Sequence, residues 1–258
     1  MTADTRVLVE AGRLAELGRS FVLVTVAGTQ GSSPRETGAK MIWLDGAAVA
    51  GTVGGGELER LAIEHAGERY ASRSGGVERF VLGADADQCC GGTVELLFEF
   101  FGPRHRLVIF GAGHVALELV RCLQAGPFEI AVVDDRPEWN NEARFGGCRR
   151  VMSFDEGVAL AAESRASTMA CVMSCSHDQD FEVLRAMLGQ PPAFVGLIGS
   201  KSKRACFFTR LAGAGIEQEA IKKINCPIGL GDMGKAPGLV AVSIAGQLLL
   251  EAARLEQL

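Results

Sequence analysis

Apolar positions along the first hundred residues alternate between helical and strand spacing. Spacings of three and four residues predict helices, and short continuous apolar runs predict strands. An Asp45-Gly46 turn joins two of these strands into a predicted β-hairpin, because Asp-Gly accepts the positive φ values of a tight turn. The expected helices span residues 6–19 and 57–69, and the expected strands span 21–26, 41–44, 47–53, 78–82 and 93–101. Together they predict a small α+β domain over residues 1–103.

A different pattern begins at Arg104, where an apolar strand, a glycine turn and a helix-compatible run repeat along the chain. This order predicts an α/β domain with a Rossmann-like, doubly wound parallel sheet over residues 104–258. Its expected strands are 106–110, 129–134, 169–174 and 194–198. Ligands bind such sheets beyond the carboxyl ends of the strands. The candidate ligand-binding residues are therefore those that follow the strands, at 111–114, 134–136, 174–180 and 199–204.

Length and charge narrow the classes of partner. A chain of 258 residues with 48% hydrophobic content has enough apolar side chains for two cores. The formal net charge of -5 gives no overall basic field, so we expect no nucleic-acid partner. The first residues mix Asp4, Arg6 and Glu10 into the apolar pattern, unlike a secretory signal, and we expect a cytoplasmic protein.

Two further classes of protein are disfavoured by the sequence. The longest apolar stretch near the end, residues 238–246, is shorter than the about 20 residues that a membrane-spanning helix needs, so we expect no membrane segment. Eight cysteines are scattered without the paired Cys-x-x-Cys spacing of a structural zinc site. We therefore expect most of them to be reduced, small core residues.

A dinucleotide-type fingerprint opens the second domain. Gly111-x-Gly113-x-x-Ala116 follows an apolar strand and precedes a helix, and Asp134 stands at the end of the next strand. Gly111 permits a sharp turn, and Gly113 lets main-chain N–H groups approach a phosphate. The alternative interpretation is a packing turn that holds no nucleotide, because a fold does not fix a function.

Other polar residues at the strand ends have more than one interpretation. His114 lies in the first turn after the fingerprint, where it either touches a ligand or is solvated. Asp135 and Arg136 are expected to pair with each other at the surface. His177, which is followed by two aspartates, is a candidate general acid or base, although helix capping by the aspartates explains the same pattern.

An adjacent pair of thiols, Cys89 and Cys90, precedes two glycines in the first domain. On an extended backbone neighbouring side chains point to opposite faces, so one sulfur can face a ligand while the other packs inside. The glycines Gly91 and Gly92 leave room for a large ligand to approach the backbone. A tight turn with two buried small residues is the alternative interpretation.

Glycine-rich turns offer the first domain a means of holding an anion. Gly54, Gly55 and Gly56 precede a predicted helix, whose first N–H groups favour an anion, and Arg35 supplies a cation. Because glycine turns are common, this pattern alone is weak evidence for a site.

In combination, these segments resemble one family, the XdhC/CoxI family of xanthine dehydrogenase accessory proteins. The resemblance extends in order over nearly the entire chain and is carried by Gly31-Ser-Ser-Pro-Arg, Gly51-Thr-Val-Gly-Gly-Gly-Glu-Leu-Glu, Gln88-Cys-Cys-Gly-Gly, Phe110-Gly-Ala-Gly-His-Val-Ala, Val133-Asp-Asp-Arg-Pro, Gly196-Leu-Ile-Gly-Ser and Pro227-Ile-Gly-Leu. Where relatives often have Thr-His-Asp-His, this chain has Ser176-His177-Asp178-Gln179. This segment therefore has one histidine, His177, in place of two.

This resemblance implies a chaperone of purine catabolism that need not catalyse a reaction. Such a protein binds the molybdenum cofactor (molybdopterin), protects it while a cysteine desulfurase supplies its terminal sulfur, and inserts it into apo xanthine dehydrogenase. Cys89 or Cys90 is then the metal contact, because a soft thiolate suits a molybdenum centre with sulfur ligands. The phosphate of the pterin is expected near Gly54, Gly55 and Gly56 or near Gly111 and Gly113. The remaining cofactor-binding candidates are Arg35, His114, Asp134 and His177.

Three alternatives remain open at this point. The Rossmann-like domain has features of an NAD(P)-dependent oxidoreductase, in which His177 donates a proton. A pure protein–protein adaptor, with no ligand in that domain, has the same sequence features. The apolar helix expected at residues 236–255 is a candidate surface for pairing two copies of the chain as a homodimer.

Overall fold

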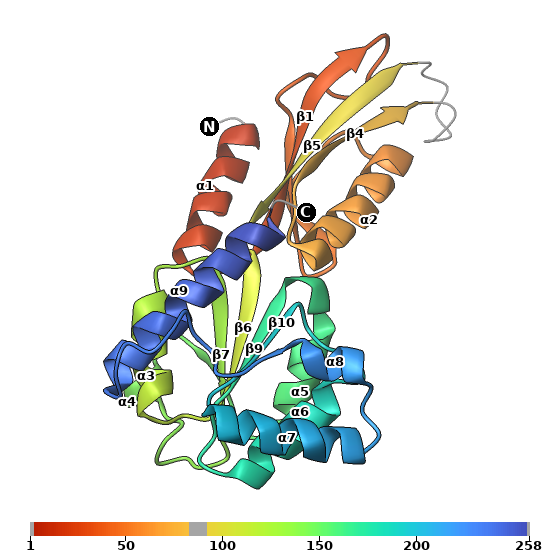
Figure 1. The fold of residues 1–258 in the computed structure, drawn as a ribbon. Coiled ribbons are helices and arrows are strands. Elements are labelled where there is room, and N and C mark those ends of the chain that lie inside the picture. Colours follow the sequence, from red (N-terminus) through yellow and green to blue (C-terminus); the bar gives the residue numbers. More distant parts are fainter. Residues whose placement is uncertain (1–2, 83–91, 257–258) are drawn as a thin grey trace. The chain divides into compact units, whose positions relative to one another are not determined.

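The computed structural model describes residues 3–82 and 92–256, and the chain folds into two compact units (Figure 1). Unit 1 comprises residues 1–103 and unit 2 comprises residues 104–258. Each unit has its own sheet and its own hydrophobic core.

The described residues of unit 1 form a five-stranded antiparallel sheet in the order β3-β2-β1-β5-β4. The predicted hairpin is confirmed, since Asp45 and Gly46 both have positive φ values between β2 and β3. The strands are β1 (Phe21–Gln30), β2 (Lys40–Leu44), β3 (Ala47–Gly51), β4 (Gly76–Val81) and β5 (Thr93–Phe101).

In the part of unit 1 that the structure describes, one helix covers each face of the sheet. α1 (Ala3–Glu16) packs on one face and α2 (Gly56–Ser72) packs on the other. Neighbouring residues of β1 alternate between the two cores, since Leu23 joins the α1 side and Val22 joins the α2 side. The predicted α+β arrangement of this unit is therefore confirmed.

Unit 2 has, within its described residues, a six-stranded sheet in the order β11-β10-β9-β6-β7-β8, which is the order of a Rossmann fold. All neighbouring strands run parallel, as the sequence predicted. The strand order reverses between β6 and β9, so the topological switch lies there. The strands are β6 (His105–Phe110), β7 (Phe128–Val133), β8 (Arg149–Val151), β9 (Thr168–Val172), β10 (Phe194–Leu197) and β11 (Ile224–Asn225).

Helices cover both faces of the parallel sheet (Figure 1). One face carries α3 (His114–Leu123), α4 (Glu142–Phe145) and α9 (Pro237–Leu255). The opposite face carries α5 (Phe154–Glu163), α6 (His177–Met187), α7 (Lys201–Gly213) and α8 (Gln218–Lys222). Because both faces are covered, every residue of β6 is buried, which explains the continuous apolar run at residues 107–110.

α9 is longer than the apolar stretch from which the sequence analysis excluded a membrane segment. It has 19 residues and a mean hydropathy of 1.4, so by length and composition alone it could cross a membrane. The polar residue Gln247 does not end the helix, because its side chain accepts a hydrogen bond from the N–H of Gly229 at 2.6 Å. The length of this apolar segment therefore does not exclude a membrane segment, contrary to the expectation. One side of α9 packs in the core of unit 2, where Ala241, Ile244 and Leu248 are buried.

Candidate functional site

The glycine turn of unit 2 lies at the switch between β6 and β9, where this fold places its ligands. Gly111 has a φ of +112°, and a Cβ atom added there would lie 2.5 Å from the carbonyl oxygen of Met173. Gly113 has an ordinary φ of -71° and open space where a Cβ atom would be. Gly111 is therefore required by the turn itself, whereas Gly113 leaves space that a ligand can use.

Asp134 is buried at the end of β7, and its carboxylate is fully engaged. Oδ1 accepts hydrogen bonds from the main-chain N–H (3.1 Å) and Nε (2.8 Å) of Arg136. Oδ2 accepts from Nη2 of Arg136 (2.7 Å) and from the N–H of Ala112 (2.8 Å). Burial raises the pKa of Asp134, but the hydrogen bonds from Arg136 and Ala112 outweigh burial and hold that pKa below its ordinary value. The expectation that Arg136 pairs with Asp135 is wrong, because the buried neighbour Asp134 takes that place.

Aromatic and cationic side chains surround the same turn. Nη2 of Arg144 donates a hydrogen bond to the carbonyl oxygen of Ala112 at 2.8 Å. The guanidinium carbons of Arg144 and Arg136 lie 4.8 and 5.2 Å from the ring centre of Trp139. His114 meets the same ring edge-on, with ring centres 5.4 Å apart. The sequence analysis missed Trp139 and Arg144, which follow β7 without any recognisable motif.

These groups border a cavity of about 430 Å³ at the carboxyl end of the parallel sheet. The structure thus brings the predicted residues Gly113 and His114 together, and Asp134 positions Arg136 in the same wall. The exposed thiol of Cys175, which lies in the predicted range 174–180, is a further lining group. The lining residues are Gly113, His114, Val115, Ala116, Arg136, Trp139, Met173, Ser174, Cys175, Ile198 and Pro237.

His177 is the first residue of α6 and is not among the residues that line this cavity. Its ring packs edge-on against Phe207, with ring centres 6.1 Å apart. The two aspartates that follow it are ion-paired, Asp178 with Arg210 and Asp180 with Lys203. Ser176, rather than an aspartate, caps α6. The geometry therefore does not place His177, the proton donor of the oxidoreductase hypothesis, among the described residues of this cavity wall, and Asp178 and Asp180 are both engaged in ion pairs.

Three loops of unit 1 meet at one end of its sheet. The strand pairing places the end of β1, the end of β4 and the start of β5 side by side. Gly92, which precedes β5, lies so close to β1 that a Cβ atom there would overlap the carbonyl oxygen of Ser32. A Cβ atom at Gly54 would lie 2.7 Å from the ring of Pro34. The loop after β1, the glycine turn before α2 and the end of the cysteine segment are therefore neighbours.

The anion-binding groups predicted in unit 1 differ in availability. The N–H of Gly54 donates to Oγ1 of Thr52 (3.2 Å), and the N–H of Gly55 donates to Oε2 of Glu59 (3.3 Å). The Thr52 hydroxyl also donates to Glu59, so a carboxylate already occupies the start of α2, which begins at Gly56. Arg35, in contrast, is exposed and lines a cavity of about 440 Å³ formed by residues 34–39.

Cys89 and Cys90 lie outside the described residues, within the segment 83–91. The two described residues that flank this segment are hydrogen-bonded to each other, because the N–H of Leu82 donates to the carbonyl oxygen of Gly92 at 2.8 Å. Within residues 3–82 and 92–256, no group of three or more His, Cys, Asp or Glu side chains is placed to hold a metal ion. A metal contact by Cys89 or Cys90 therefore stays a prediction.

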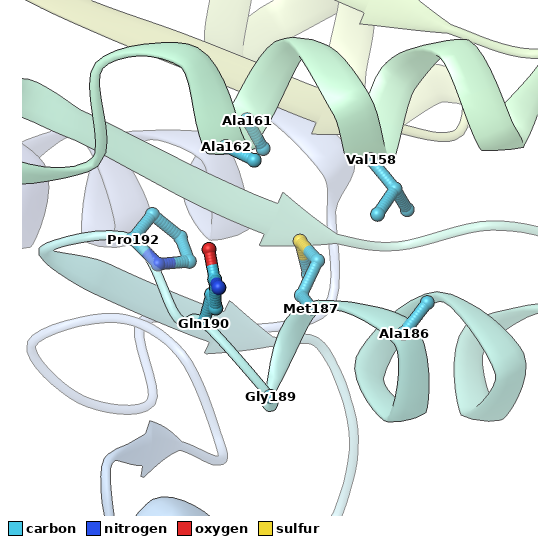
Figure 2. A pocket seen from close by; sticks show the side chains of 8 residues that line it. All are labelled: Val158, Ala161, Ala162, Ala186, Met187, Gly189, Gln190 and Pro192. Carbon is cyan, nitrogen blue, oxygen red and sulfur yellow. The ribbon is translucent and has the colours of Figure 1, made fainter.

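A second cavity of unit 2, about 210 Å³ in volume, lies between α5 and α6 (Figure 2). Its lining residues are Val158, Ala161, Ala162, Ala186, Met187, Gly189, Gln190 and Pro192. These side chains are apolar apart from Gln190, and none of them titrates. Pro192 precedes β10, so this cavity is at the amino ends of the strands, away from the switch point. We assign it no chemical role.

The strand order, the glycine turn and the cavity at the switch point define unit 2 as a Rossmann-type domain. Residues 107–248 match the family model of the XdhC Rossmann domain, and residues 14–81 match that of the XdhC and CoxI family. The chain belongs to the XdhC family, as its sequence motifs indicated. Neither match includes residues 82–106, which contain Cys89 and Cys90.

Two relatives show how far this similarity extends. The chain is 30% identical over 251 residues to the Escherichia coli (strain K12) protein YqeB, which is described as uncharacterized. The alignment covers 94% of this chain and 46% of YqeB, so the chain spans about half the length of that relative. A crystal structure described as a xanthine dehydrogenase from Bacillus halodurans is similar with a TM-score of 0.50 and 20% identity, covering 98% of this chain and 96% of that one. This second similarity shows a shared fold.

Proposed function

We propose that this protein is a cytoplasmic accessory protein that binds the molybdenum cofactor and inserts it into apo xanthine dehydrogenase. Membership of the XdhC family supports the accessory role. The observation that carries the cofactor assignment is the meeting of three loops at one end of the unit 1 sheet. There the Ser32–Pro34 loop adjoins the Gly54 turn through Pro34 and adjoins Gly92 through Ser32, and Gly92 directly follows the segment with Cys89 and Cys90.

The chemistry at this end of unit 1 suits both ends of the cofactor. A thiolate from Cys89 or Cys90 is a soft ligand, which fits a molybdenum centre that already has sulfur ligands. Arg35 offers a guanidinium for the phosphate of the pterin, whereas Glu59 makes the start of α2 a poor phosphate site. When bound, the cofactor supplies the redox-active metal of the target enzyme. In this proposal the chain itself holds and shields the group while a cysteine desulfurase provides the terminal sulfur.

The proposal is tested by purifying the full chain anaerobically from cells that make the cofactor, followed by molybdenum and pterin analysis. We expect the wild-type protein to retain both. In the Cys89→Ala/Cys90→Ala variant we expect molybdenum to fall to the background of cells that lack the protein, because no soft ligand remains in that segment. Metal analysis by mass spectrometry and fluorescence of the oxidised pterin measure the two components separately.

The matched control is Cys122→Ala/Cys206→Ala, which removes two exposed thiols from unit 2. This variant should retain molybdenum at the wild-type level. Wild-type occupancy in the Cys89→Ala/Cys90→Ala variant would show that the thiols do not hold the metal. A wild-type protein that carries neither metal nor pterin would rule out the cofactor-binding function itself.

A further inference from the structure

The cavity at the switch point of unit 2 has N–H donors that suit an anion. Its lining includes the guanidinium of Arg136 and the imidazole of His114, and none of the described residues in its wall is acidic. The remaining wall is apolar, with Met173, Ile198 and Trp139 among its members. A cavity of about 430 Å³ with a few convergent polar groups on an apolar wall is typical of a site for a small organic ligand.

The positive ends of two helices meet the same cavity. His114, the first residue of α3, and Pro237, the first residue of α9, both line it. No side chain caps either helix, so the first N–H groups of α3 have no partner within the helix or from a cap. Arg144 donates a hydrogen bond to the carbonyl oxygen of Ala112. Because a trans peptide places its C=O and N–H on opposite sides, the N–H of Gly113 points away from Arg144. These N–H groups are suited to a phosphate.

The pairing of Asp134 with Arg136 changes which ligand the site accepts. In Rossmann folds that bind NAD, the acidic residue at this position accepts hydrogen bonds from the ribose hydroxyls. Here all four hydrogen bonds to the Asp134 carboxylate come from Arg136 and Ala112, and the carboxylate is buried. The ribose hydroxyls would therefore have to displace a bidentate guanidinium. Arg136 still has N–H groups that Asp134 does not use, and these are donors for a phosphate.

We propose that unit 2 binds a phosphate ester of a planar heteroaromatic ring and discriminates against the free ribose diol of NAD⁺. The phosphate is held by Arg136 and the main-chain N–H groups at the start of α3. The ring lies against the apolar wall formed by Met173, Ile198 and Trp139. Two sources share this chemistry, a nucleotide whose adenosine ribose carries a 2′-phosphate, such as NADP⁺, and the phosphorylated pterin of the molybdenum cofactor. The site belongs to unit 2 alone, so it does not depend on the assignment of Cys89 and Cys90.

The test is calorimetric titration of the full chain with NADP⁺, NAD⁺, inorganic phosphate and the metal-free phosphorylated pterin. We expect at least one phosphate ester to bind more tightly than NAD⁺, and the ester that binds identifies the source. Arg136→Gln should weaken that ester roughly 10- to 100-fold, because a charge-assisted contact is lost. The same variant should not weaken NAD⁺, because Asp134 is then freed for the ribose hydroxyls. Arg121→Gln, which removes an exposed arginine paired with Glu118 on α3, is the matched control and should bind like the wild type.

A second variant keeps the inference testable if Arg136→Gln unfolds. Gly113→Ala adds a methyl group into open space at an ordinary φ, so it should fold normally and weaken the ester by crowding its phosphate. The inference is overturned if no ester binds, if NAD⁺ binds as tightly as the esters, or if inorganic phosphate alone accounts for the affinity. Unchanged ester affinity in both folded variants would overturn it as well. Repeating the titration with Cys89→Ala/Cys90→Ala separates this site from the proposed metal site, since that variant should keep its ester affinity.

Discussion

Replacing Gly111 with alanine is expected to lower the free energy of unfolding of unit 2 by about 3 to 5 kcal/mol. At a φ of +112°, the new Cβ atom would lie 2.5 Å from the carbonyl oxygen of Met173 and 2.7 Å from Cα of Ser174. Both are backbone atoms, so no side-chain rotation relieves the overlap. Urea denaturation monitored by Trp139 fluorescence measures the change, in a Trp43→Phe background that leaves one tryptophan in the chain.

The control for this substitution is Gly113→Ala, two residues further along the same turn. Its φ of -71° suits alanine and its added methyl group meets no atom within 4 Å, so we expect a change of less than about 1 kcal/mol. The background substitution lies in the core of unit 1 and removes no side-chain hydrogen bond, because the buried indole N–H of Trp43 has no hydrogen-bond partner among the described residues. Equal losses of stability in the two alanine variants would contradict the strain assigned to Gly111.

The fold was predictable where local pattern and burial agree. Residues 107–110 of β6 are all apolar because both faces of the sheet are covered, and such a run identifies a central parallel strand. β8 (Arg149–Val151) and β11 (Ile224–Asn225) were not predicted. They have three and two residues, and β8 begins with two exposed arginines, so neither shows an apolar run or alternation that a sequence pattern could reveal.

The site was predictable only in part, because its chemistry depends on pairings that the local motif does not specify. The fingerprint identified Gly111, Gly113 and Asp134, each of which occupies its usual place in the fold. Asp135 was expected to be the partner of Arg136, whereas the partner is its neighbour Asp134. Side chains two residues apart share a side of an extended chain, and this rule, applied to residues 134–136, would have indicated Asp134. No comparable signal exists for Arg144, which reaches Ala112 across 32 residues.

Asp180 forms a buried ion pair in unit 2. Its loss is the second substitution that we expect to lower the free energy of unfolding strongly. Its side chain is completely buried, its Oδ1 accepts the N–H of Ser174 at 2.9 Å, and its Oδ2 accepts Nζ of Lys203 at 2.7 Å. Asp180→Ala leaves an ammonium group at 11% exposure without its partner and an N–H group without its acceptor. We expect the free energy of unfolding to fall by about 3 to 5 kcal/mol, measured by urea denaturation in the same Trp43→Phe background.

Asp178, which lies two residues before Asp180 on α6, is the matched comparison. Asp178 is 87% exposed and pairs with Arg210 at 3.2 Å, so Asp178→Ala should cost less than about 1 kcal/mol. If the unpaired ammonium of Lys203 is the main cause of the loss in Asp180→Ala, then Asp180→Ala/Lys203→Met should recover part of the stability, because no buried charge remains. Equal losses in the Asp178 and Asp180 variants would show that burial does not set the strength of these pairs. Failure of the double variant to recover stability would instead assign the loss to the anchoring of Ser174, which lines the proposed ester site.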